Sequence, residues 1–279
     1  PTLVITDNTT GTATGDVSFT FSFSEAVFGF SADDITLSSG SKGTFSGSDG
    51  DSSYSLIVTP DANSSGTITV DVPAAAALDA AGNSNAAATQ ATQAFDTASP
   101  TLVITDNTTG TATGDVSFSF NFSEDVTGFT VDDITITGGS KGTFSGSDGD
   151  SSYSLIVTPD ANSSGTITVD VPAAAALDAA GNSTSAQQAT QAFDTASPSV
   201  VITDDTSGTA VGDVTFTFTF SEAVYGFTSD DITLSSGSKG TFSGTDGDSS
   251  YSLIVTPDAD SSGTITAVSY THLTLPTSR

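Results

Sequence analysis

The sequence predicts an all-β protein, a linear array of antiparallel β-sandwich domains, and three observations support this prediction. First, the chain repeats: the heptapeptide Pro1–Asp7 returns unchanged as Pro100–Asp106 and with two changes as Pro198–Asp204, at periods of 99 and 98 residues. A unit of this length exceeds the ~20–50 residues of a solenoid repeat and suits a self-contained domain. Second, apolar and polar residues alternate within each unit, which is the period of a half-buried strand. Third, Gly, Asn and Asp, which favour turns, separate the alternating runs.

The repeats place the domains at residues 1–99, 100–197 and 198–266, because proline interrupts strand pairing at each boundary. The third copy is truncated, since the sequence after Thr266 matches nothing upstream. Segment 267–279 resembles the read-through of a sequencing adapter, and we expect it to be a non-native tail. It holds the only His and the only Arg, so we exclude both from any site. The chain has no Met, so we expect it to be a fragment of a longer protein.

Seven segments of the first copy are predicted to be strands. In chain order they are residues 2–6, 16–24, 34–38, 43–46, 53–59, 66–72 and 89–95. The second segment carries the strongest signal, because Val17, Phe19, Phe21 and Phe23 alternate with Ser and Thr and form one aromatic face. Asp-Gly between the fourth and fifth segments predicts a hairpin.

One further segment of the copy predicts a different local structure. Residues 73–78 read as a single helical turn, with Pro73 at its first position and Gly82 as its stop. We expect Leu78 to close the end of the core.

Seven short strands in about 98 residues predict an immunoglobulin-like antiparallel sandwich of about seven strands. The chain has no Cys and no Trp, so the disulfide and the tryptophan of antibody domains are missing. Besides the aromatic face of the second strand, the residues expected to fill the core are Tyr54, Leu56, Ile68, Val70 and Phe95.

The charge of the chain excludes several kinds of partner. There are 33 acidic residues against 4 Lys and Arg, which gives a net charge of −29. Such a surface repels nucleic acids and anionic lipid head groups, and no run of about 18 apolar residues is long enough to span a bilayer. We expect no nucleic-acid partner and no membrane insertion, whereas a polyanion of Asp side chains attracts divalent cations.

Catalytic chemistry has little support in the sequence. Without Cys, and without His outside the tail, nucleophile–His pairs and transition-metal sites are excluded. Asp33 and Asp34 are adjacent where the predicted third strand begins, and adjacent strand residues point to opposite faces, so the two side chains would not converge on one substrate. We expect that the chain is not an enzyme.

Several motifs of the copy carry a resemblance to a known family. They are GDVSFTFSFSEAVFGFSADDITL, GTFSG, YSLIVTPDANSSGTITVDV, ALDAAGN and FDTASPT, at consistent spacing. Together they resemble a bacterial immunoglobulin-like (Big) domain, a kind of domain that occurs in tandem arrays in large secreted adhesins. The resemblance covers the first two copies and the third copy up to Thr266. It implies a structural extender in cell adhesion, located outside the cell or on the cell surface, commonly with calcium at the domain junctions.

The strand order of such a sandwich predicts at which end of each domain the acidic residues lie. The C-terminal pole of each domain, where its last strand ends, faces the N-terminal pole of the next domain across a linker of about four residues. Calcium takes six to eight oxygen ligands, so facing acids together with the resemblance predict an inter-domain calcium site. The preferred ligands at the first junction are Glu124, Asp178 and Asp96.

Further candidate ligands lie at both junctions. They are Asp7, Asp133 and Asn182 at the first junction, and Asp106, Asp194, Glu222 and Asp231 at the second. The second site is expected to be poorer, because the third copy has lost its Asp-Ala-Ala-Gly-Asn loop. The alternative is that the acids only keep the surface soluble and form turns.

The predicted function is therefore a structural extender, or stalk, of a bacterial extracellular or cell-surface adhesin. Its host-cell, glycan or surface ligand would be bound elsewhere in the full-length protein. The alternative is a carbohydrate- or protein-binding accessory module of a secreted enzyme, a surface layer or a phage particle. Glycan binding usually needs exposed aromatic residues, and the loose candidates are Phe28 and Tyr225, with Thr127 at that position in the second copy.

Overall fold

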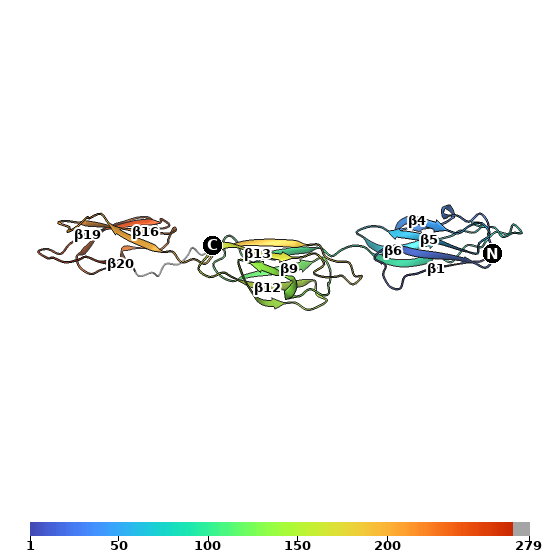
Figure 1. Cartoon of the computed structure of the whole chain (residues 1–279), viewed down its shortest axis with the longest axis horizontal. Coiled ribbons are helices and arrows are strands. Elements are labelled where there is room, and N and C mark those ends of the chain that lie inside the picture. The colour runs from blue at the N-terminus through green and yellow to red at the C-terminus, as the bar shows by residue number, and fades with distance from the viewer. Residues whose placement is uncertain (270–279) are drawn as a thin grey trace.

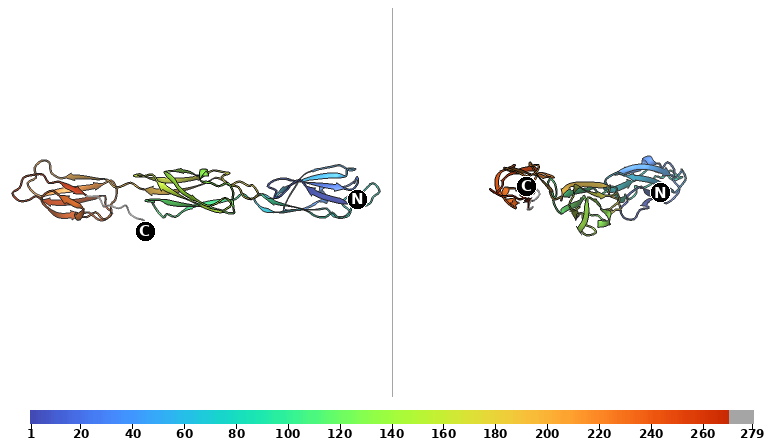
Figure 2. Two further views of the ribbon diagram at one scale, coloured as in Figure 1. Left: turned by 90° about the horizontal axis from the view of Figure 1, so that it is seen from below. Right: turned by 60° about the vertical axis from the view of Figure 1, so that its left-hand side comes forward.

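The computed structural model describes residues 1–269, which form three domains in a row. The views of Figures 1 and 2 agree that the domains follow one another end to end, each with its own sheets. Residues 270–279, which include most of the predicted tail and His272, lie outside the described residues. No helix within residues 1–269 has the length and apolarity needed to cross a membrane.

The first domain is a sandwich of two antiparallel sheets. One sheet has the order β1-β2-β5-β4 and the other the order β3-β6-β7. The strands are β1 (Leu3–Asp7), β2 (Val17–Phe23), β3 (Thr36–Ser38), β4 (Gly40–Ser46), β5 (Ser53–Pro60), β6 (Ser65–Asp71) and β7 (Ala91–Asp96). This four-plus-three arrangement is the topology of a constant-type immunoglobulin domain, so the predicted fold class is confirmed.

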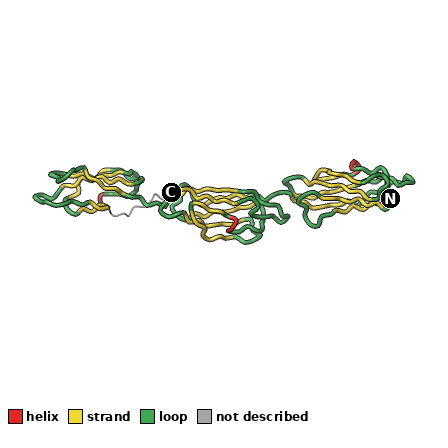
Figure 3. Tube along the Cα trace, in the orientation of Figure 1, coloured by secondary structure: helices red, strands yellow, loops and turns green. Residues whose placement is uncertain are grey.

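The second domain repeats this topology, with sheets β11-β12-β9-β8 and β10-β13-β14. Its strands are β8 (Leu102–Asp106), β9 (Val116–Phe122), β10 (Thr135–Thr137), β11 (Gly139–Ser145), β12 (Ser152–Pro159), β13 (Ser164–Val171) and β14 (Gln187–Asp194). Single 3-10 turns precede the short third strand of each domain, and Figure 3 shows them as the few red segments. They are η1 (Ala32–Asp34), η2 (Val131–Asp133) and η3 (Ser229–Asp231).

Each domain has its own core between its two sheets. In the first domain the even spacing along β2 places Phe19 and Phe21 fully inside, and the predicted core residues of the other strands are buried with them. The Tyr54 hydroxyl donates to the carbonyl oxygens of Val27 and Ser48 at 3.2 and 2.9 Å, so the buried phenol is satisfied and holds the loop of Ser48 against the core.

The predicted helical turn at residues 73–78 is wrong. Ala75 has a φ of 64°, which a right-handed helix does not allow, and its N–H donates to the Asn85 carbonyl at 3.0 Å. The buried Asn85 side chain also accepts from the Ala77 N–H at 2.8 Å. Ala77 therefore faces the core, whereas Leu78 is 44% exposed and does not close it as predicted.

The third domain lacks a counterpart of β7 and β14 among the described residues. Its sheets are β15-β16-β19-β18 and β17-β20. The strands are β15 (Val200–Asp204), β16 (Val214–Phe220), β17 (Ile232–Leu234), β18 (Ser238–Ser243), β19 (Ser250–Thr256) and β20 (Ala267–Ser269). The first three residues of the predicted tail thus form β20, which pairs with β17 as β13 pairs with β10.

Candidate metal centre

The loop Asp178-Ala-Ala-Gly-Asn182 presents a carboxylate at the N-terminal pole of the second domain. Asp178 is only 4% exposed. One of its oxygens accepts from the backbone N–H groups of Ala180, Gly181 and Asn182 at 2.7–2.8 Å, and the other from the Asn182 amide at 2.8 Å. The loop can close this tightly because Gly181 adopts a φ of 98°. The carboxylate of Asp178 is therefore fixed in position before any ligand arrives.

Asp96 brings a second carboxylate from the first domain. It is the last residue of β7, and its N–H donates to the Ala13 carbonyl at 2.8 Å. One of its carboxylate oxygens accepts from the Ala98 N–H at 3.0 Å, which turns the linker. The side-chain amide of Asn182 donates to the Asp96 carbonyl at 3.1 Å, so a hydrogen bond crosses the junction and ties the linker to the second domain.

Glu124 adds a third carboxylate from the loop after β9. The loop is held against the start of the second domain, because the Ser123 N–H donates to the Thr101 carbonyl at 2.9 Å and the Thr101 N–H to the Ser123 hydroxyl at 3.0 Å. Asp96, Glu124 and Asp178 each offer an oxygen, and these three oxygens all lie within 4.8 Å of one another. They are the three preferred ligands of the predicted first-junction site, and the structure brings them together.

We call these three acids the junction triad. Their surroundings shift the pKa values of Glu124 and Asp178 in opposite directions. Burial, followed by the charges of Asp178 and Asp96, raises the pKa of Glu124. Burial also acts to raise the pKa of Asp178, but the hydrogen bonds from Asn182, Gly181 and Ala180 outweigh it and hold that pKa below its ordinary value. Asp178 therefore stays ionised, and the repulsion among the three carboxylates acts on the pKa of Glu124 instead.

No described cation compensates the junction triad. Each domain has one lysine, and each lysine amine donates to a carbonyl at the 3-10 turn of its own domain, at 2.6–2.7 Å. The one ion pair within residues 1–269 joins the Pro1 ammonium to Glu25. The donor set fits a hard divalent cation, because calcium–oxygen distances of about 2.3–2.6 Å allow two ligand atoms of one ion to lie at most about 5 Å apart.

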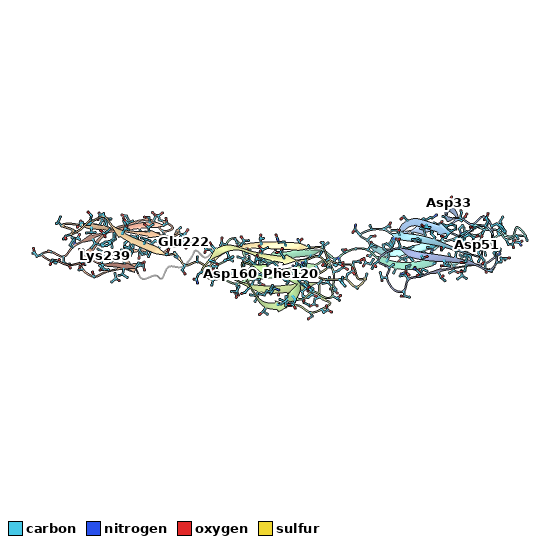
Figure 4. All side chains as sticks on the ribbon, viewed as in Figure 1. Asp33, Asp51, Phe120, Asp160, Glu222 and Lys239 are labelled. Atoms are coloured by element: carbon cyan, nitrogen blue, oxygen red, sulfur yellow. The ribbon has the colours of Figure 1, made fainter. Side chains whose placement is uncertain are left out.

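The other predicted ligands do not join such a group within residues 1–269. Asn182 contacts the junction triad through its amide nitrogen, which is a donor. Glu222 lies at the pole of the third domain that faces the second domain (Figure 4). Each of the remaining acids accepts a hydrogen bond from a nearby backbone N–H. The acids with backbone partners are Asp7, Asp106, Asp133, Asp194 and Asp231.

Sequence reasoning missed a structural role for two of these acids. Asp133 and Asp231 accept from the backbone N–H and the hydroxyl of the threonine three residues earlier, at 2.7–3.0 Å, and so cap their 3-10 turns. Asp34 does the same with Ser31 in the first domain. The Ser/Thr-x-x-Asp spacing is typical of a capping box. This pattern in the sequence argues against Asp133 and Asp231 as metal ligands.

A family model described as a bacterial Ig-like domain matches residues 1–95, 96–193 and 194–275. Among solved structures, the chain is similar to InvD of Yersinia pseudotuberculosis, at 13% identity and a TM-score of 0.30, over 98% of this chain and 83% of that chain. It is similar to domains 1–6 of the surface layer protein SbsC, at 14% identity and a TM-score of 0.24, over 98% of this chain and 53% of that chain.

A marsupial T cell receptor is similar at 12% identity and a TM-score of 0.25, over 97% of this chain and 98% of that chain. A comparison with the curated proteins gives no match. The family match covers nearly the whole chain and confirms the resemblance that the sequence motifs carry.

Proposed function

The chain belongs to the family of bacterial Ig-like domains, and on this premise we propose that it is part of the stalk of an extracellular or cell-surface adhesin, stiffened by calcium between its first two domains. Tandem repeats of this family fit an extracellular structural role. The end-to-end order of the domains supports an extender, because each further copy adds length without a side-by-side interface. In this role the chain performs no catalysis, and its contribution is mechanical.

The junction triad is the observation that carries the proposal. Two of its carboxylates come from the second domain and the third from the end of the first domain. Without a cation these like charges repel one another and favour separation of the two poles. A bound calcium ion would turn the repulsion into shared coordination and hold both domains to one ion. Water and backbone oxygens would complete the shell, since three carboxylates alone do not supply six to eight ligands.

The first domain builds the same loop at its own N-terminal pole. Glu25 and Asp79 correspond to Glu124 and Asp178, and the Asp79 loop makes the same hydrogen bonds with Asn83. The hydrogen bonds from Asn83 and Ala81 hold the pKa of Asp79 below its ordinary value. The first domain thus builds the same fixed, ionised carboxylate at this pole, which supports a shared role for the loop in both domains.

Calcium titration of the full chain by isothermal titration calorimetry tests the proposal. We expect saturable binding at one dominant site, with a dissociation constant on the order of the 10⁻⁴–10⁻³ M of extracellular modules. Glu124→Gln removes one charge of the junction triad and keeps the shape of the side chain. We expect this variant to bind calcium at least about tenfold more weakly, with each sandwich still folded by circular dichroism.

Glu222→Gln is the matched control. Glu222 occupies the position of Glu124 in the third copy, but no Asp-Ala-Ala-Gly-Asn sequence follows Thr266 in this chain. We expect this variant to bind calcium as the unaltered chain does. Equal weakening by both substitutions would mean that calcium only condenses on the acidic surface, and the absence of saturable binding would refute the site altogether.

A further inference from the structure

Thr97 ties the linker of the first junction to the first domain. It is the residue that directly follows β7. The Thr97 N–H donates to the Ser64 carbonyl at 2.9 Å, and the Ser64 N–H donates to the Thr97 hydroxyl at 3.2 Å. The same hydroxyl donates to the Asp61 carbonyl at 2.7 Å. Thr97 is therefore held to the turn between β5 and β6, residues 61–64, through both its backbone and its side chain.

This contact extends the pairing of β6 with β7 beyond the last residue of β7. The pairing ends at Ser65↔Asp96, and the bond from the Thr97 N–H to Ser64 adds one residue to it. The end of a strand frays where nothing beyond its last pair holds it. Because Thr97 is bonded on two of its groups, Asp96 lies within a closed ladder and not at a free end.

The position of Asp96 decides whether the junction triad can form. Glu124 and Asp178 both belong to the second domain, so Asp96 is the member of the triad that comes from the other side of the linker. Its carbonyl accepts from the Asn182 amide of the second domain at 3.1 Å. A swing of the chain that began at Asp96 would carry its carboxylate away from the other two.

The second domain ends in the same clamp. The Thr195 N–H donates to the Ser163 carbonyl at 2.8 Å, and the Thr195 hydroxyl donates to the Asp160 carbonyl at 2.6 Å. The Ser163 N–H donates to this hydroxyl at 3.2 Å. At this second junction no group of three acids comes together among residues 1–269. Thr195 therefore provides a control in which the same bonds are lost away from the junction triad.

We propose that Thr97 is the positioning residue of the first junction: it confines the hinge to the linker residues after it and presents the Asp96 carboxylate to the rest of the junction triad. The calcium part of this inference rests on the proposed function, whereas the confinement of the hinge does not. A group that is ordered before binding lowers the entropic cost of the complex. Calcium therefore binds the clamped junction more tightly than one whose linker is free from Asp96 onward.

The hinge is measured first, in the full chain without calcium. The chain has no Cys, so spin labels can be attached to cysteines introduced at the exposed positions Thr44 and Thr143, one in each of the first two domains. Thr97→Val replaces the hydroxyl by a methyl group of similar size. By double electron–electron resonance we expect it to broaden the distribution of distances between the labels, because a longer free linker spans a wider range. Thr195→Val should leave this distribution unchanged.

Two further variants at the same position guard the result. Thr97→Ser keeps the hydroxyl and should restore the narrow distribution of the unaltered chain. Thr97→Ala leaves space for water at the Asp61 carbonyl and provides the same test if the valine variant does not fold. Circular dichroism shows whether each variant is folded at the temperature of the measurement.

Calcium titration by isothermal titration calorimetry gives the second readout. We expect Thr97→Val to bind calcium about tenfold more weakly, since about one more backbone residue must be ordered on binding. Thr97→Ser and Thr195→Val should bind calcium as the unaltered chain does.

The outcomes separate this inference from the calcium site itself. If the unaltered chain binds no calcium, the proposed function fails, and the distance distributions alone decide whether Thr97 confines the hinge. An unchanged distance distribution in Thr97→Val overturns the inference. So does calcium binding that Thr97→Val leaves unchanged, or that Thr97→Val and Thr195→Val weaken equally.

Discussion

Ser269 shows how one side chain affects the truncated domain. It occupies the position of Val72 and Val171, both of which are core residues. Its hydroxyl is buried and has no hydrogen-bond partner among the described residues. A buried polar group without a partner costs about 1–3 kcal/mol. Ser269→Val should therefore raise the free energy of unfolding of the third domain by about that amount in urea titrations. Ser235→Val, at an exposed hydroxyl that is already hydrogen-bonded, is the comparison that should bring no such gain.

Glu124 gives the second domain a pH dependence whose sign follows from its pKa. Burial and the charges of Asp178 and Asp96 raise this pKa above the ordinary 4.5, so the folded domain favours the protonated form. The resulting destabilisation is fully present above the raised pKa and is relieved as the pH falls through it toward 4.5. In calcium-free buffer, Glu124→Gln should raise the melting temperature near pH 7 and should lose this advantage near pH 4. A difference between variant and parent that does not change with pH would contradict the assignment.

At the scale of the element, the open edge of β20 determines how stable the third domain of this chain is. Among residues 1–269, no strand pairs with β20 on the side where β7 pairs with β6 and β14 with β13. We expect residues from about Ser199 onward to be cleaved first in limited proteolysis, and to melt at a lower temperature than the second domain. Mass spectrometry of the fragments provides the measurement. Equal resistance of the second and third domains in calcium buffer would argue against this.

The strands were predictable because their signals are local. The alternation along residues 17–23 fixes which face of β2 is buried whatever the rest of the domain does, and β2 is one residue shorter at each end than the predicted segment 16–24. Segment 73–78 was not predictable, because the left-handed Ala75 depends on hydrogen bonds to Asn85, which is distant from it in the sequence. The proximity of the junction triad followed from the loop order of the fold. That calcium binds there stays a prediction.

For the whole molecule, the first junction and the second junction differ in their chemistry. The first has the junction triad and a hydrogen bond from Asn182 to Asp96 across the linker. At the second, the given sequence holds the counterparts Asp194 and Glu222 and no counterpart of Asp178. Calcium should therefore act on the angle between the first two domains far more than on the angle between the last two.

Small-angle X-ray scattering of the full chain measures this difference. A calcium ion that binds only the folded junction would shift the equilibrium by mass action, so on the proposed function we expect millimolar calcium to lengthen the particle and to raise the melting temperature. Sodium at the same ionic strength only screens the charges and should do much less. Asp178→Asn should remove most of the lengthening, whereas Asp258→Asn, an acid away from both junction sites, should preserve it. If chelation changes neither the particle length measured by scattering nor the melting temperature, the acids only form a solvated surface and no metal stiffens the junction.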